Sequence, residues 1–221
     1  MVRNGIDPSQ WTPHVGRSEA RQELEIPDDA PVILTACRLF PSKGPAELIR
    51  ALATVRKRHP KVRLLIIGRE MVPGYAAELA SLADALGLTE HVRLLGHRHD
   101  VARLMAAAEV FAMPSIGEPF GLVYLEAMAM ELPVVALDSG GAPEVIQDGA
   151  TGLLSAPGDV AALAENLATL ISDPERRARM GRNGRLRLEA NFTSERMAAD
   201  VAAVYRRVLD GRDLVGMKGQ R

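Results

Sequence analysis

Two glutamates flank the segment with the clearest chemical signal. Glu118 and Glu126 stand eight residues apart, and Pro119 follows the first of them. Proline favours the first turn of a helix, so the next backbone N–H groups should lack acceptors there, and the helix dipole adds positive charge. These amides belong to Phe120, Gly121 and Leu122. The segment therefore predicts a seat for an anion at a helix start.

The second glutamate lies in an otherwise apolar stretch, residues 123–129. A carboxylate is unfavourable in such surroundings unless it accepts hydrogen bonds, which the hydroxyls of a sugar or a ribose could donate. At about 1.5 Å per residue, Glu126 lies nearly two turns into the predicted helix, so the two carboxylates can address different parts of one elongated ligand. Two alternatives remain open: Glu118 caps the helix, and Glu126 pairs with a buried arginine.

Two cations, Arg38 and Lys43, follow the first apolar run of the chain. Only 4 of the 27 basic side chains are lysines, so a lysine at this position departs from the usage of the sequence. A compact ammonium is suited to act as a point charge on a phosphate. The alternative is a solvated surface lysine that has no partner.

The elements that must position these residues are short. Nearly continuous apolar runs, typical of strands buried on both faces, alternate with segments of helical spacing. The runs occupy residues 32–37, 64–67, 92–95, 110–113 and 134–137. This alternation predicts an α/β fold, a Rossmann-like three-layer domain with a parallel sheet and helices on both faces. Because ligands of such sheets bind beyond the carboxyl ends of the strands, we expect the loops carrying Arg38, Gly68, His97 and Glu118 to meet at one edge.

The two ends of the chain differ from this pattern. Prolines interrupt residues 1–30, which we interpret as an interdomain crossover or linker, and residues 31–209 form the predicted Rossmann-like domain. Within it, Asp159 can cap a helix, and the last helices, at about 174–209, should lie largely outside the sheet. Residues 210–221 contain three glycines and no periodicity, so a flexible tail is expected.

Composition and missing motifs exclude several classes of function. With 27 basic and 28 acidic side chains the net charge is −1, so no nucleic-acid partner is expected. The single cysteine, Cys37, excludes a disulfide framework and a Cys-rich metal site. Dinucleotide, Walker and nucleophile-elbow fingerprints are all missing. Without an apolar run of membrane-spanning length or a signal-peptide pattern, a cytoplasmic location is predicted.

Two further features leave alternatives open. His97 and His99 could form a metal pair, but no third ligand stands at a recognisable spacing and no Asp-x-Asp pair occurs, so no metal site is predicted. The arginine-rich stretch 176–187 could touch a membrane surface or a polyanion, although a solvated helix face is the commoner explanation of such a run.

Several segments together resemble a known family. Residues 114–136, with their Glu118-x7-Glu126 spacing, are similar to the signature region of the retaining glycosyltransferases of family 4, which have the GT-B fold. Glu131 stands where that family usually has glycine. Other similar segments are residues 38–43, 140–145 and 148–154, and residues 4–7, which look like the interdomain crossover. The similarity extends from about residue 2 to about residue 209.

The resemblance implies roles for the charged residues. Arg38 and Lys43 would neutralise the diphosphate of a nucleotide-sugar donor, and Glu118 would face the hydroxyls of the transferred sugar. These three are the expected catalytic residues. Bond breaking would be driven mainly by electrostatic stabilisation of the leaving diphosphate through Arg38, Lys43 and the helix amino terminus, with no cofactor or metal required. The expected donor-binding residues are Gly68, His97, Arg98, Phe120, Gly121, Leu122 and Glu126, with Glu126 on the ribose and the loop at His97 and Arg98 meeting the base through its backbone.

GT-B enzymes have two Rossmann-like domains, and the resemblance covers only the carboxy-terminal, donor-binding one. We therefore expect the donor-binding half of a retaining glycosyltransferase that uses a UDP-, GDP- or ADP-sugar. Its expected partner is a missing amino-terminal acceptor-binding domain or an equivalent subunit, without which the chain is inactive or weakly active. The full-length enzyme could contact the inner face of a membrane. One alternative is a noncatalytic nucleotide-sugar-binding module; another, an epimerase or phosphorylase, would need its own acid, base or cofactor lysine.

Overall fold

The computed structural model describes residues 2–12 and 16–210. Its six strands form one sheet in the order β3-β2-β1-β4-β5-β6, and every neighbouring pair is parallel. The strands are β1 Val32–Ala36, β2 Arg63–Ile67, β3 Val92–Leu94, β4 Val110–Met113, β5 Val134–Leu137 and β6 Gly152–Ser155. This is the strand order of a Rossmann fold, with its switch point between β1 and β4. The predicted fold class and five predicted strands are confirmed, and β6 is an addition.

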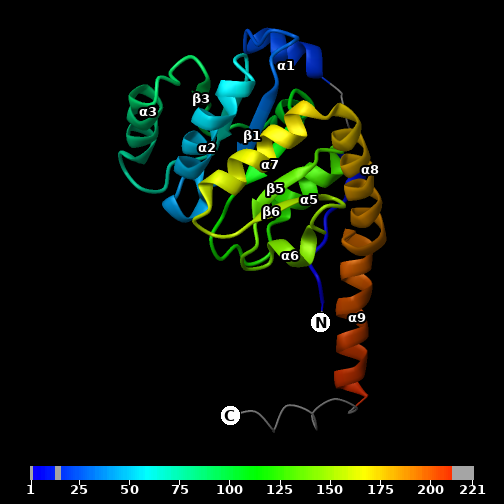
Figure 1. Ribbon diagram of the computed structural model, residues 1–221. Coiled ribbons are helices and arrows are strands. Elements are labelled where there is room, and N and C mark those ends of the chain that lie inside the picture. Colours follow the sequence, from blue (N-terminus) through cyan, green and yellow to red (C-terminus); the bar gives the residue numbers. More distant parts are fainter. Residues whose placement is uncertain (1, 13–15, 211–221) are drawn as a thin grey trace.

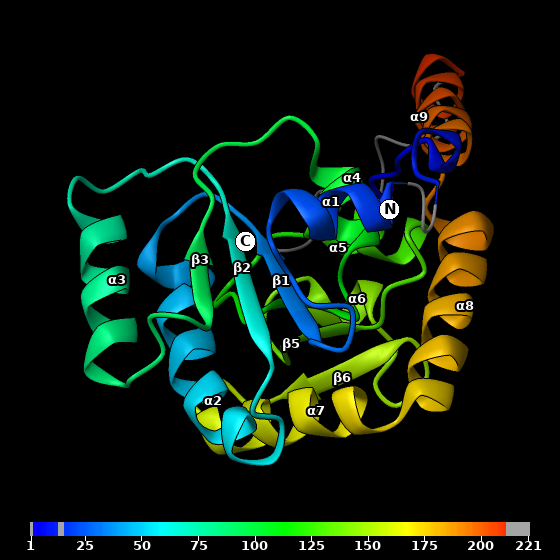
Figure 2. The ribbon, with the colours of Figure 1, turned by 90° about the horizontal axis from the view of Figure 1, so that it is seen from above.

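Helices cover both faces of the sheet (Figures 1 and 2). They are α1 Arg17–Glu23, α2 Pro45–Arg58, α3 Tyr75–Ala85, α4 Val101–Ala106, α5 Leu122–Ala129, α6 Ala142–Val145, α7 Val160–Ser172, α8 Pro174–Asn191 and α9 Ser194–Leu209, with short 3-10 helices at Pro8–Gln10 and Pro41–Lys43. Helices α2, α3 and α7 cover one face, and α1, α4, α5 and α8 the other. Alternate side chains of each strand enter the two cores, as Leu34 and Ile33 do in β1.

Local sequence accounts for where the helices begin and which faces they bury. In α2, Leu48, Leu52 and Val55 recur at helical spacing, and all three are buried against α7 and the sheet. The predicted cap of α7 is confirmed, since the side chain of Asp159 accepts a hydrogen bond from the Ala162 amide at 2.8 Å. The sheet is therefore held from both sides, and the loops at its carboxyl edge extend from rigid supports.

Residues 1–30 contain a helix and a buried arginine that the sequence did not indicate. The side chain of Arg21 in α1 is 3% exposed and donates to the carbonyl oxygens of Pro27 and Ala30 and to both carboxylate oxygens of Glu109, at 2.8 to 3.1 Å. Glu109 also accepts from the amide of Val32 at 2.6 Å. The network ties this segment to the beginning of β1. The domain boundary at residue 30 stays a prediction.

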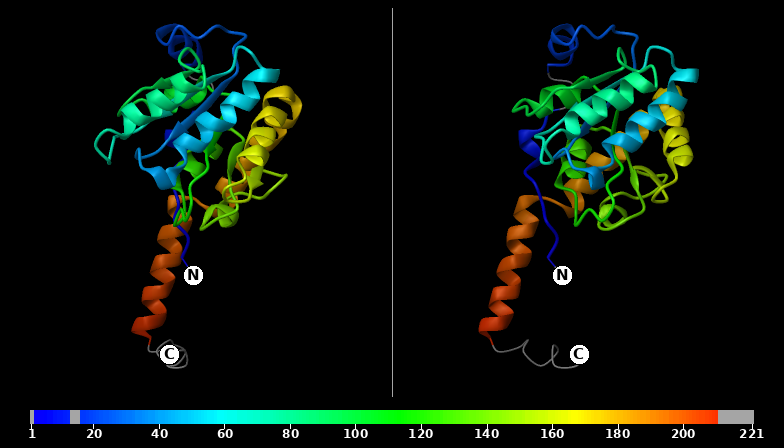
Figure 3. Two further views of the ribbon diagram at one scale, coloured as in Figure 1. Left: turned by 60° about the vertical axis from the view of Figure 1, so that its left-hand side comes forward. Right: turned by 90° about the vertical axis from the view of Figure 1, so that its left-hand side faces the viewer.

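The two carboxy-terminal helices have different environments. Helix α8 packs along α5 and reaches the main body, whereas α9 projects from it and has no buried residue (Figures 1 and 3). The junction lies beside the amino-terminal segment, where the Ile6 amide donates to the Phe192 carbonyl at 3.0 Å. Apart from Asp210, the predicted tail lies outside the described residues. No helix in the described ranges is long and apolar enough to cross a membrane.

Candidate functional site

The loops that follow β1 and β4 are locked together at the carboxyl edge of the sheet. The carbonyl oxygen of Ser42 accepts hydrogen bonds from the Ile116 amide at 2.8 Å and from the Ser115 hydroxyl at 3.2 Å. Gly44 has a φ of 75° and packs so tightly that a Cβ atom there would lie 2.3 Å from the carbonyl oxygen of Pro114. The first loop is thus docked on the fourth, which fixes the position of Lys43.

Lys43 and Glu118 form an ion pair across these two loops. Lys43 Nζ lies 2.5 Å from Glu118 Oε2, and the two side chains are only 16% and 13% exposed. The hydroxyl of Ser115, a fully buried residue, lies 3.5 Å from the same oxygen. Lys43 is therefore not a solvated lysine, and Glu118 does not cap α5, whose N-cap is Gly121.

A pocket of about 410 Å³ opens beside this pair. Its lining residues are Arg38, Phe40, Ser42, Lys43, Met71 and Pro119. Arg38 is exposed, and its guanidinium makes no hydrogen bond or ion pair with any residue that the structure describes. The pocket therefore combines one cation neutralised by a carboxylate with one that has no counter-charge among the described residues, which is an arrangement suited to a multiply charged anion.

A second pocket of about 430 Å³ adjoins the first and shares Arg38 and Met71 with it. It is lined by the loops after β1, β2 and β3, and it brings together Gly68, His97 and Arg98 as predicted from the sequence. A Cβ atom at Gly68 would lie 1.6 Å from the carbonyl oxygen of Cys37, so only glycine permits this approach. Burial raises the pKa of the Cys37 thiol to about 11, which keeps it neutral.

The guanidinium of Arg98 is engaged by the protein itself. It donates to the carboxylate of Asp100 at 2.7 and 2.8 Å and to that of Glu23 at 2.9 Å. These hydrogen bonds, to Asp100 above all, raise the pKa of Arg98 above its ordinary value. The side chain therefore holds the loop after β3 against α1.

Helix α5 begins at Leu122, three residues later than predicted, so the placement of Pro119 in its first turn is wrong. The physical reason lies in the loop after β5. The Gly141 amide donates to the Glu118 carbonyl at 2.7 Å, and a Cβ atom at Gly140 would lie 2.4 Å from that same oxygen. This packing keeps residues 117–119 out of the helix. The paired glycines thus serve a close approach between two loops.

The backbone N–H groups of the predicted anion-binding segment are nevertheless free to donate hydrogen bonds. The amides of Phe120, Gly121 and Leu122 donate to no other residue within the described ranges. The ring of Phe120 packs edge-on against Phe192 at 5.9 Å between centroids, so its side chain belongs to the core while its amide stays available. These amides precede and begin α5, where the helix dipole is positive.

Glu126 lies about one turn into α5, roughly 6 Å along the axis from Leu122 and not the predicted two turns. Its half-buried carboxylate forms no hydrogen bond or ion pair with the described part of the chain, so the buried-arginine alternative does not hold there. Burial raises its pKa. It does not line either of the two adjoining pockets, and the structure does not bring it into contact with Lys43 or Glu118.

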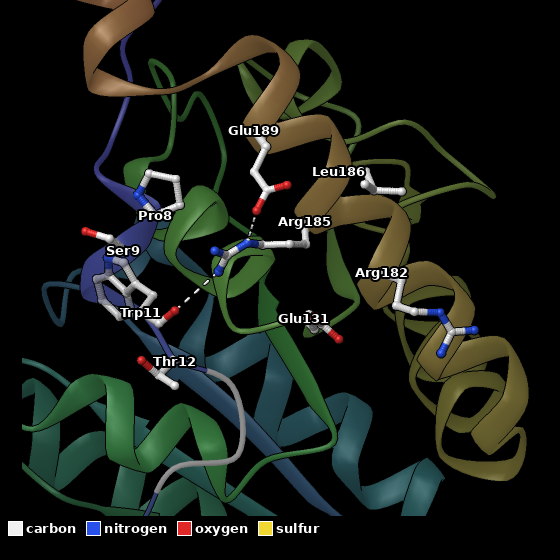
Figure 4. A pocket seen from close by; sticks show the side chains of 9 residues that line it. All are labelled: Pro8, Ser9, Trp11, Thr12, Glu131, Arg182, Arg185, Leu186 and Glu189. Atoms are coloured by element: carbon white, nitrogen blue, oxygen red, sulfur yellow. Dashed lines mark hydrogen bonds and ion pairs between the residues drawn. The ribbon is translucent and has the colours of Figure 1, made fainter.

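A larger pocket of about 550 Å³ lies elsewhere, between residues 8–12 and α8 (Figure 4). Arg185 spans it, donating to Glu189 and to the Trp11 carbonyl. Glu131, another lining residue, belongs to the turn that leads into β5, and this places the pocket toward the amino ends of the strands. None of the predicted site residues lines it. Its size alone does not make it the functional site, and the cation that spans it, Arg185, already has a counter-charge in Glu189.

The described residues contain no group of three or more His, Cys, Asp or Glu side chains that could hold a metal ion. The rings of His97 and His99 pack edge-on against each other, 4.7 Å apart. The sequence also missed the contributions of Ser42 and Ser115, which hold the two loops together. Serines are common in loops, and nothing in the spacing of these two marked them.

Comparison with known proteins places the chain in a family. The sequence model described as glycosyl transferases group 1 matches residues 16–187. The chain belongs to the group 1 glycosyl transferases. It is 39% identical over 205 residues to a GDP-mannose-dependent monoacylated alpha-(1-6)-phosphatidylinositol monomannoside mannosyltransferase of Corynebacterium glutamicum, covering 88% of this chain and 52% of that protein.

Two solved structures extend the comparison. Anabaena HepE, crystallised in complex with UDP and glucose, is 33% identical with a TM-score of 0.87, covering 93% of this chain and 56% of that one. The C-terminal domain of a group 1 glycosyl transferase from Francisella tularensis is 27% identical with a TM-score of 0.76, covering 86% of this chain and all of that one. The fold thus matches GT-B glycosyltransferase structures. The chain spans about half the length of the curated relatives it matches.

Proposed function

We propose that this chain is the donor-binding half of a retaining family 4 glycosyltransferase, which transfers a sugar from a nucleoside-diphosphate sugar to an acceptor. The observation that supports this most strongly is a pocket at the carboxyl edge of the sheet that Arg38 and Lys43 line together with Pro119, the residue directly before the free amides of residues 120–122. Side-chain cations and a helix start together suit a diphosphate. The relative that uses GDP-mannose and the structure that holds UDP agree with such a ligand.

In this proposal each group at the edge has a separate task. Arg38 and Lys43 bind the diphosphate and stabilise its charge as the bond to the sugar breaks, and the amides of residues 120–122 hold a phosphate and the sugar. Glu118 accepts from sugar hydroxyls, and Glu126 from the ribose. The base lies in the pocket formed by Gly68 and the backbone at His97 and Arg98. No metal or other cofactor takes part.

The acceptor site belongs to a separate amino-terminal domain or subunit in this proposal. The likeness to an isolated C-terminal domain and the half-length match to the relatives both support this division. Helix α9 also supports it, since it buries none of its residues yet presents Val201, Val204 and Val208 to solvent. The alternative is a noncatalytic module with the same donor-binding site, which works only when docked to a separate acceptor-binding subunit. The cytoplasmic location and a membrane contact stay predictions.

A thermal-shift screen tests donor binding directly, because a ligand of the folded state raises the melting temperature. The ligands are UDP, GDP, ADP and their sugars UDP-glucose, GDP-mannose and ADP-glucose. At least one pair should stabilise the wild-type chain, and the Lys43→Ala variant should lose that shift. Lys57→Ala, which removes an exposed lysine of α2, is the matched control and should keep it. Absence of any shift with all six ligands, confirmed by calorimetry, would refute the proposed function.

A second measurement separates the enzyme from the noncatalytic module. The chain is mixed with the stabilising donor and with the amino-terminal half of a relative, and release of nucleoside diphosphate is followed. Turnover that depends on both parts supports the transferase, and the Arg38→Ala and Lys43→Ala variants should then reduce it. Donor binding without turnover in any such mixture favours the module.

A further inference from the structure

The pairing of Lys43 with Glu118 joins two groups that the proposed function assigns to different parts of the donor. Their contact at 2.5 Å is largely shielded from water, with 16% and 13% of the side chains exposed. Arg38 has no such partner among the described residues, and neither has Glu126. Of the two cations assigned to the diphosphate, Lys43 alone therefore has a counter-ion among the described residues.

A diphosphate that binds Lys43 must either face the charge of Glu118 or displace Glu118 from the lysine. If Glu118 stayed on Lys43, its negative charge would face the incoming phosphate oxygens across one ammonium group in a poorly solvated place, where like charges repel strongly. If Glu118 gave up the lysine, its carboxylate would retain only the Ser115 hydroxyl at 3.5 Å as a protein donor. A shielded carboxylate in that position needs new donors.

We propose that Glu118 is a specificity-determining residue that favours the intact nucleotide sugar over the free nucleoside diphosphate. When the donor binds, its diphosphate pairs with Lys43 in place of Glu118, and the hydroxyls of its sugar donate hydrogen bonds to the freed carboxylate. The free nucleoside diphosphate also pairs with Lys43, but it has no sugar hydroxyls to donate hydrogen bonds to Glu118. After the sugar has been transferred, Glu118 pairs with Lys43 again. This weakens binding of the nucleoside diphosphate product and speeds the release of that product. The inference rests on the proposed function of the site.

Isothermal titration of the full chain with the stabilising ligand pair measures this preference as the ratio of the dissociation constant of the diphosphate to that of its sugar. In Glu118→Gln the nucleoside diphosphate should bind about tenfold more tightly, because no carboxylate repels it and none competes with it for Lys43. The nucleotide sugar should gain nothing, so the ratio falls about tenfold. Glu144→Gln, which removes an exposed carboxylate of α6, controls for net charge and should leave the ratio unchanged.

A double-mutant cycle shows whether Glu118 acts through Lys43. In the Lys43→Met background there is no lysine to compete for and only the repulsion remains, so Glu118→Gln should tighten binding of the diphosphate by less than it does beside Lys43. Should Glu118→Gln fail to fold, Glu118→Asp replaces it, since a side chain shorter by one methylene cannot keep the 2.5 Å contact unchanged. An unchanged ratio, or the same gain with and without Lys43, overturns the inference. A wild-type chain that binds neither ligand refutes instead the proposed function, so the two failures are distinguishable.

Discussion

Replacement of Lys43 by alanine should weaken binding of a nucleoside diphosphate by about 100-fold. A hydrogen bond to a charged group contributes about 1.5–3 kcal/mol. The variant also leaves the carboxylate of Glu118, 13% exposed, facing the diphosphate without its cation, and this repulsion adds to the loss. A total near 3 kcal/mol corresponds to roughly two orders of magnitude in the dissociation constant.

The assay compares a nucleoside diphosphate with its parent nucleoside by isothermal titration, because only the former reaches Lys43. Binding of uridine, guanosine or adenosine should change by less than about threefold in Lys43→Ala. The Lys57→Ala variant should bind both ligands as the wild type does. Equal weakening of the nucleoside and the diphosphate would show that Lys43 supports the fold of the pocket and does not bind phosphate.

Three further variants test the structural basis of the account. Glu109→Ala removes the carboxylate that pairs with Arg21 and should lower the free energy of unfolding by about 3 kcal/mol in urea denaturation; a loss below about 0.5 kcal/mol would contradict the network. Glu131→Gly relieves a φ of 55° and should stabilise the chain by about 1 kcal/mol, raising the melting temperature by roughly 2–4 °C; a lower melting temperature would count against strain there. For Glu126, burial raises the pKa above the ordinary 4.5, so the folded chain binds the proton more tightly than the unfolded chain and loses stability as pH rises through that range. The Glu126→Gln variant should therefore melt higher than the wild type at pH 7 without ligand, with a gain that vanishes below about pH 4; a gain independent of pH would exclude this cause.

The strands were predictable because apolar runs such as residues 110–113 are buried on both faces, and burial of that kind leaves a direct trace in composition. Strand β6 was missed because it contains only two large apolar residues, which lie between Gly152 and Ser155. A run that short cannot be distinguished from a loop by its sequence. The start of α5 was misplaced for a different reason. Pro119 has the right local preference, but contacts with Gly140 and Gly141 from a distant loop override it.

The meeting of the candidate site's loops at one edge was predictable, because the loops after β1, β2, β3 and β4 all follow the carboxyl ends of parallel strands. Which residues of those loops pair was not predictable. Lys43 and Glu118 are 75 positions apart, and their contact depends on the docking of two loops through Ser42. Arg98 and Arg38 look alike in the sequence, yet one is held by Glu23 and Asp100 while the other has no counter-charge from the described residues.

The most direct test of the account is a two-dimensional ¹H–¹⁵N spectrum of the full chain, titrated with the nucleoside diphosphate that stabilises it. If the diphosphate sits at the helix start, the amides of Phe120, Gly121 and Leu122 should show the largest shifts, because each gains an acceptor. Residues around the pocket of Figure 4, such as Trp11 and Leu186, should stay unchanged. Shifts centred on that pocket, with residues 120–122 unmoved, would contradict the placement of the donor at the carboxyl edge of the sheet.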